Sequence, residues 1–249
     1  GKGSLAANTT ASNNTAVGKN SLTANTTGFS NTALGKDALT ATTTGDSNVS
    51  VGQNSMAANT TGDDNVAVGQ AALDANTTAD GNTAVGKSSL GANTTGNSNV
   101  AVGSFTLDAN TVGDRSVAVG YNALSTQNPA SNVDMYNTAV GFNAGLSVTT
   151  GLNNTLIGGN AGDAITTGSE NVALGRSALS ADTLGAHSVA IGFQALAAQN
   201  FTSATDVYNV AVGYNAGVSV TTGAGNTFVG GLAGDATTTA ANNTAVGLN

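Results

Sequence analysis

The sequence predicts an all-β parallel β-solenoid with one coil for each 17-residue repeat. Three observations support this fold class: a glycine recurs at a fixed period, the positions before it keep a constant character, and the composition does not suit a thick core. The chain of 249 residues contains 34 Gly, no Trp and no Cys, and only 4% of its residues are aromatic. These features favour a stack of thin coils over compact domains.

The repeated glycine sets the period. Starting in phase with Gly1, it follows an aliphatic residue at Gly18, Gly35, Gly52, Gly69, Gly86, Gly103, Gly120, Gly141, Gly158, Gly175, Gly192, Gly213, Gly230 and Gly247. Of these 14 intervals, 12 are 17 residues long, and the coils 120–141 and 192–213 are 21 residues long. The block of four coils at 120–191 repeats from residue 192. Residues 1–249 therefore form a single array of about 14 coils.

The residues before each glycine predict a short strand. The preceding residue is always Val, Leu or Ile, and the residue two positions earlier is always Thr or Val, as in Thr15 and Val17. Because residues two apart in a strand share a face, we expect these two rows to line the core. Glycine and asparagine steps suit the bends that follow.

The position between these two rows bears on oligomeric state. It is Ala in 11 of 14 coils, and the exceptions are Ser50, Leu156 and Phe228. On the expected face assignment this small apolar row points outward, where it suits close packing against another copy of the chain. The alternative is that the alanine row lies on a second layer of the same chain.

A second apolar row follows the glycine. Most coils carry Leu or Met four residues after it, but Gly145, Gly162, Gly217 and Gly234 replace this residue. In three of those coils an aliphatic residue appears three positions later, and we expect it to refill the core; these residues are Val148, Ile165 and Val220. Thr237 occupies that position in the fourth coil.

Two short motifs resemble known repeats. The segments 116–120 (Ser-Val-Ala-Val-Gly) and 187–192 (His-Ser-Val-Ala-Ile-Gly) resemble the head repeats of YadA-like trimeric autotransporter adhesins. The pattern at 93–103 resembles repeats of phage and bacterial tail-fibre proteins. The resemblance implies a left-handed β-roll in a homotrimer, displayed on a cell or virion surface and used for attachment. The period of 17 is longer than the coil usual in those adhesin heads.

Charge and hydropathy exclude several function classes. Charged residues make up 8% of the chain and the net charge is −8, so we expect no nucleic-acid partner. No apolar run approaches the length of about 18 residues that spans a bilayer, so we expect no membrane insertion by this segment. The only histidine, His187, precedes a strand and is expected to be solvated. We expect no catalysis. Since no initiator Met is present, we also expect the sequence to be part of a longer chain.

The two 21-residue coils are the candidate ligand-binding sites. Each extra loop ends in an acidic and an aromatic residue, and further aromatic residues follow the neighbouring repeat glycines. Aromatic rings beside carboxylates suit a sugar ligand, and loops on a rigid scaffold often carry binding. The alternative is that these aromatic side chains only pack the loops. The candidate residues are Tyr121, Asp134, Tyr136 and Phe142, with Phe193, Asp206, Tyr208 and Tyr214 in the second coil.

Two polar rows offer other possibilities. Asp46, Asp63 and Asp80 occupy the same position on consecutive coils, where three carboxylates suit one Ca²⁺ ion; the alternative is a solvated turn. No other cofactor is expected. Threonine rows that begin at Thr9 and Thr10, with Asn8 beside them, suit an ice-binding array. The alternative is that such Thr and Asn rows satisfy the backbone of the turns.

Taken together, these features predict an extracellular attachment segment, an adhesin head or a tail-fibre shaft, whose partners are further copies of itself and a host surface glycan or protein. An ice-binding solenoid and a self-assembling extracellular filament are the alternatives.

Overall fold

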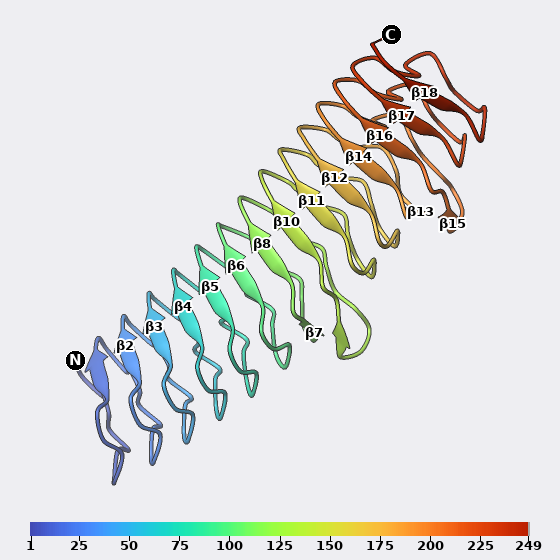
Figure 1. The fold of residues 1–249 in the computed structure, drawn as a ribbon. Helices are drawn as coiled ribbons and strands as arrows, with labels where there is room; N and C mark the ends of the chain where they lie inside the picture. The colour runs from blue at the N-terminus through green and yellow to red at the C-terminus, as the bar shows by residue number, and fades with distance from the viewer. Residues whose placement is uncertain (249) are drawn as a thin grey trace. The chain divides into compact units, whose positions relative to one another are not determined.

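The computed structural model describes residues 1–248 and is a parallel β-solenoid of about 14 coils with a 17-residue repeat (Figure 1). This confirms the predicted fold class. No helix occurs in the described range. The coils divide into two units: unit 1 comprises residues 1–119 with 128–134, and unit 2 comprises residues 120–127 with the chain from 135 onward.

Unit 1 contains seven repeat strands that pair in parallel and in register. Each pairs with the strand one repeat later, so that Thr15, Ala16 and Val17 lie opposite Thr32, Ala33 and Leu34. Val51 in turn lies beside Leu34, which confirms that equivalent positions stack. The strands are β1 (Thr15–Val17), β2 (Thr32–Leu34), β3 (Val49–Val51), β4 (Val66–Val68), β5 (Thr83–Val85), β6 (Val100–Val102) and β8 (Val117–Val119).

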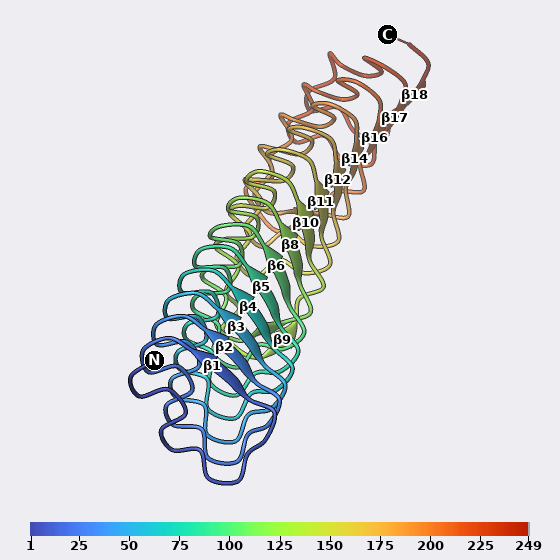
Figure 2. The ribbon, with the colours of Figure 1, turned by 90° about the vertical axis from the view of Figure 1, so that its left-hand side faces the viewer.

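Unit 2 repeats this arrangement with seven strands of its own. They pair in the same parallel register, for example Leu156 opposite Ala173. The strands are β10 (Thr138–Val140), β11 (Thr155–Ile157), β12 (Val172–Leu174), β14 (Val189–Ile191), β16 (Val210–Val212), β17 (Thr227–Val229) and β18 (Thr244–Val246). In each unit the strands lie along one side of the coils and turns form the remainder (Figure 2).

Each 21-residue coil adds a short strand at its extra loop. In unit 1, β9 (Val133–Asp134) pairs in parallel with β7 (Gly113–Asp114) in the turn of an earlier coil. In unit 2, β15 (Thr205–Asp206) pairs with β13 (Gly185–Ala186). The inserted residues are therefore held by backbone pairing to the coil before them.

The predicted orientation of the strand faces is wrong. The alanine row is buried, with Ala33, Ala67 and Ala101 fully inaccessible, whereas the residues on either side of it face outward. Leu34 is 48% exposed and Leu174 42% exposed. The core is thin, and the row of Leu and Met from the opposite wall already fills it, so only a small side chain fits on the strand side. The alternative in which alanine lies on a second layer of the same chain is correct.

Two large residues in the alanine row explain the missing leucines. Leu156 is fully buried, and a Cβ added to Gly145 or Gly162 would lie 2.7 Å from one of its methyl carbons. Phe228 is 1% exposed and occupies the same space beside Gly217 and Gly234. Val148, Ile165 and Val220 are also fully buried, as expected. The exchange of a small and a large residue across the core thus keeps its volume constant, including in the coil with Thr237.

Buried asparagines bind successive coils together. In the asparagine row, which we define as Asn31, Asn48, Asn65, Asn82 and Asn99, each side chain is inaccessible. The Asn48 N–H donates to Asn31 Oδ1 at 2.9 Å, and the Asn65 N–H donates to Asn48 Oδ1 at 3.0 Å. Asn48 Nδ2 donates to the Gly62 carbonyl at 2.8 Å. One side chain therefore satisfies backbone groups that no strand pairing reaches.

The repeat glycine is required by the close stacking of the coils. A Cβ on Gly35, whose φ is +149°, would lie 2.3 Å from the Gly52 carbonyl oxygen. That distance is far below van der Waals contact with a backbone atom that cannot move aside. The glycine therefore sets how closely the coils approach.

The core exchange predicts a reversal of mutational effect. Phe228→Ala should lower the free energy of unfolding by about 3 to 5 kcal/mol, because it leaves a cavity. Gly234→Leu alone should also destabilise, since its Cβ would lie 2.5 Å from the Phe228 ring. The double variant should regain most of the loss, because it restores the Ala and Leu pair of other coils. Urea unfolding followed by circular dichroism measures all three; additive losses would contradict the exchange.

Candidate functional site

A column of exposed rings and cations runs along unit 2. We call it the aromatic column and define it as the residues that follow the repeat glycine: Tyr121, Phe142, Gly159, Arg176, Phe193, Tyr214 and Gly231. The rings of Tyr121 and Phe142 stack with centroids 5.7 Å apart and planes at 10°. Those of Phe193 and Tyr214 stack at 5.3 Å and 12°. The structure thus brings together the four aromatic residues as two stacked pairs.

These rings present their surface to solvent. Phe142 is 56% exposed and Tyr214 57% exposed. The Arg176 guanidinium carbon lies over the Phe193 ring at 4.5 Å from its centroid, so cation–π attraction extends that pair by one coil. In unit 1 the same position carries mostly Lys and Gln. The strands before these positions fix their spacing at one coil, about 4.8 Å.

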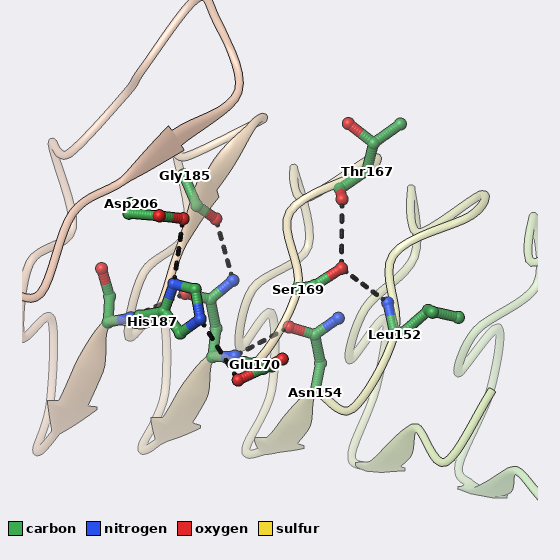
Figure 3. Close-up of polar contacts among 10 residues, drawn as sticks. Leu152, Asn154, Thr167, Ser169, Glu170, Gly185, His187 and Asp206 are labelled. Atoms are coloured by element: carbon green, nitrogen blue, oxygen red, sulfur yellow. Dashed lines mark hydrogen bonds and ion pairs between the residues drawn. The ribbon is translucent and has the colours of Figure 1, made fainter.

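The acidic residue of the second loop lies beside the histidine. Asp206 Oδ1 is 3.2 Å from His187 Nδ1, and Glu170 Oε2 is 3.2 Å from His187 Nε2 (Figure 3). The His187 ring also stacks on Tyr208 with centroids 5.0 Å apart. The imidazole therefore lies between two carboxylates and against a ring, in place of the solvated position expected from the sequence.

The first loop uses an arginine at the equivalent position. In unit 1 the Arg115 guanidinium pairs with the Asp134 carboxylate, 72 residues before the pair of His187 and Asp206. Asn132 Nδ2 also reaches Asp114 Oδ1 at 3.3 Å. Both loops are therefore anchored by an acidic residue that contacts a basic residue of an earlier coil.

The predicted site residues separate into two groups. Tyr121, Phe142, Phe193 and Tyr214 follow repeat strands, whereas Asp134, Tyr136, Asp206 and Tyr208 precede them. The two groups therefore lie at opposite ends of three-residue strands. Asp206 contacts His187, and the ring partner of Phe193 is Tyr214. In unit 2 the acidic residue and the exposed ring pairs thus belong to different edges of the coils.

The aspartate row lies in register but has a backbone role. Asp63 Oδ1 accepts the Asp46 N–H at 2.7 Å, and Asp80 Oδ1 accepts the Asp63 N–H at 2.7 Å. Asn97 continues the same series by accepting the Asp80 N–H at 2.8 Å. Within residues 1–248 no group of three or more His, Cys, Asp or Glu side chains is placed to hold a metal ion. An amide serves this row as well as a carboxylate does.

The threonine and asparagine rows also satisfy backbone groups. Thr26 Oγ1 donates to the Thr43 carbonyl at 3.0 Å, and Thr60 Oγ1 donates to the Thr77 carbonyl at 2.9 Å. Asn25 and Asn59, which continue the row of Asn8, are fully buried. The exposed array of Asn8 and Thr10 columns is therefore wrong in its asparagine column, whereas the Thr27 row is exposed.

Burial and hydrogen bonding shift the pKa of three carboxyl groups. The Asn20 amide, followed by Lys36, lowers the pKa of Asp37. Desolvation raises the pKa of Asp74 and Asp108. All three lie in unit 1 outside the aromatic column, so they reflect local packing.

Comparisons with known proteins assign no family. No protein-family model matches the chain, and no significant match is found among curated proteins or solved structures. The residues described here enclose no pocket, and they form no helix of the length and hydropathy that crosses a bilayer.

Sequence reasoning missed three participants. Glu170 and His187 come together because they occupy equivalent turns of neighbouring coils, a relation that the period alone contains. Gly159 interrupts the aromatic column, and its signal is the absence of a side chain where neighbouring coils carry Phe142 and Arg176.

The aspartate row predicts the effects of two substitutions. Asp63→Asn should leave the melting temperature within about 2 °C of the parent, because the amide oxygen accepts the same N–H. Asp63→Ala should cost about 1 kcal/mol, since the Asp46 N–H loses its acceptor. Thermal unfolding in EDTA and in millimolar Ca²⁺ should give the same values; stabilisation by Ca²⁺ that Asp63→Asn abolishes would contradict this role.

Proposed function

We propose that the chain is the repeat segment of an extracellular attachment fibre, an adhesin head or tail-fibre shaft, that binds a surface glycan and performs no catalysis. The observation that carries the proposal is the aromatic column. Stacked, half-exposed rings on a rigid scaffold offer flat apolar faces, and aromatic faces are suited to the C–H surface of sugars. Their spacing is fixed by strand pairing, so little conformational entropy is lost on binding.

A homotrimeric left-handed β-roll is the assembly proposed for this segment. The alanine row no longer supports it, because that row is internal. The support now comes from the outer rows, which we define as the residues on either side of each central strand residue. They are Thr or Val and Val, Leu or Ile in every coil, and Val17 is 54% exposed in the single chain. Continuous apolar rows of this kind favour burial against another copy.

The attachment proposal is tested by replacing the exposed rings. A variant in which Tyr121, Phe142, Phe193 and Tyr214 are changed to Ser should lose at least about tenfold in binding to glycan-coated surfaces, because stacking contributes about 1 kcal/mol per ring. The control carries Ser at Thr61, Thr78 and Thr95, which are exposed in unit 1. Equal binding of the two variants would overturn the proposal.

The same preparations test the assembly. Native mass spectrometry should give three times the 23.9 kDa of one chain, and Val66→Lys with Val68→Lys should yield monomers by placing charge on the outer rows. A parent that is already monomeric would contradict the trimer. Thermal hysteresis of the parent would instead favour the ice-binding alternative.

A further inference from the structure

The aromatic column of unit 2 contains one open position. A Cβ added to Gly159 has no atom within 4 Å, in contrast to Gly231, where Leu248 lies 3.2 Å away. The coils on either side of Gly159 carry Phe142 and Arg176, and backbone bonds link all three: the Asn160 N–H donates to the Phe142 carbonyl at 2.9 Å and the Ser177 N–H to the Gly159 carbonyl at 3.0 Å. Gly159 therefore lies between a ring and a guanidinium.

The open position is one ring wide. Phe142 and Arg176 are two coils apart, which places their side chains roughly 10 Å from one another at the usual strand spacing. A ring midway would lie about 5 Å from each, and the filled steps of this column measure 5.7, 4.5 and 5.3 Å. One inserted ring would thus continue the column from Tyr121 to Tyr214.

The two walls of this position differ in chemistry. One face of Phe142 is covered by Tyr121, and the ring as a whole is 56% exposed. On the other side, Arg176 is held over Phe193, which orients the guanidinium, and it forms no ion pair with any residue in the range 1–248. An apolar face opposite an unpaired cation suits a ligand that has an apolar ring face and an anionic group.

We infer that the open position at Gly159 binds one acidic pyranose residue of a glycan, with its C–H face on Phe142 and its carboxylate on Arg176. A pyranose chair is thicker than an aromatic ring because of its axial hydrogens, so it fills a step of this size better than a flat ring does. A guanidinium pairs with a carboxylate through two parallel hydrogen bonds. The inference rests on the proposed attachment function and specifies its ligand and position.

Gly159 offers a direct blocking variant. Its φ lies outside the left-handed region, and equivalent positions carry Tyr121, Phe142 and Phe193, so Gly159→Phe should fold and fill the position with a ring of the chain itself. Gln70→Phe is the matched control, because it places a ring at the equivalent exposed position of unit 1. Melting temperatures of both variants establish that folding is unchanged.

Isothermal titration calorimetry with sialyllactose, a hyaluronan tetrasaccharide and lactose tests the inference. The parent should bind at least one acidic sugar about tenfold or more tightly than lactose, because a charged hydrogen bond contributes about 1.5 to 3 kcal/mol. Sialyllactose and the hyaluronan fragment distinguish a sialic acid from a uronic acid. Arg176→Gln should remove the preference for the acidic sugar, and Gly159→Phe should abolish binding, whereas Gln70→Phe should retain it.

The outcomes separate this inference from the attachment proposal. Ring-dependent attachment to glycan surfaces that survives Gly159→Phe would overturn the inference and leave the attachment proposal standing. Acidic sugar binding that Gly159→Phe abolishes, in a chain that fails to attach to surfaces, would support the inference and overturn attachment. Absence of binding to all three sugars, or binding in which Arg176→Gln has no effect, would also overturn the inference.

Discussion

The structure depends on the hydrogen bonds that buried asparagine side chains make between coils. A coil of 17 residues has only three residues in its repeat strand, so most of its backbone lies in turns where strand pairing is absent. Asn48 accepts from the next coil and donates to the Gly62 carbonyl, and its own N–H is accepted by Asn31. Because an amide both donates and accepts, the same residue type at every level continues the series. Uniform rows in the sequence are therefore a consequence of stacking like residues over like.

The core adapts to this constraint by exchanging volume between its two walls. Most coils combine an alanine on the strand side with Leu or Met on the turn side. Where the turn side carries Gly145 and Gly162, Leu156 supplies the missing volume, and Phe228 does so for Gly217 and Gly234. Each large residue lies between two glycines and thereby fills the space of two levels. The 72-residue block preserves this arrangement, and the two aromatic pairs recur with the same spacing.

The period, the strand position and the parallel register could be predicted from the sequence, because each depends on spacing alone. The inward face could not. Alternation divides Thr15, Ala16 and Val17 into two faces, but which face is internal depends on the space left by Leu22 across the coil. Aliphatic residues then lie outside, contrary to the usual rule, because the interior is too thin for them. The candidate site was predicted in part: the four rings pair as neighbours, whereas Asp206 lies at the other edge with His187 because the strand separates them.

The central claim is that identical positions lie one coil apart along a stack, and spin-label distances in unit 1 test it most directly. Thr10, Thr78 and Thr95 are exposed and share one row. Labels at Thr10→Cys with Thr78→Cys are four coils apart and should be about 19 Å apart, and Thr10→Cys with Thr95→Cys should give about 24 Å. Dilution with unlabelled chain restricts the signal to pairs within one molecule. Distances that fail to increase by about one strand spacing for each added repeat would contradict the account.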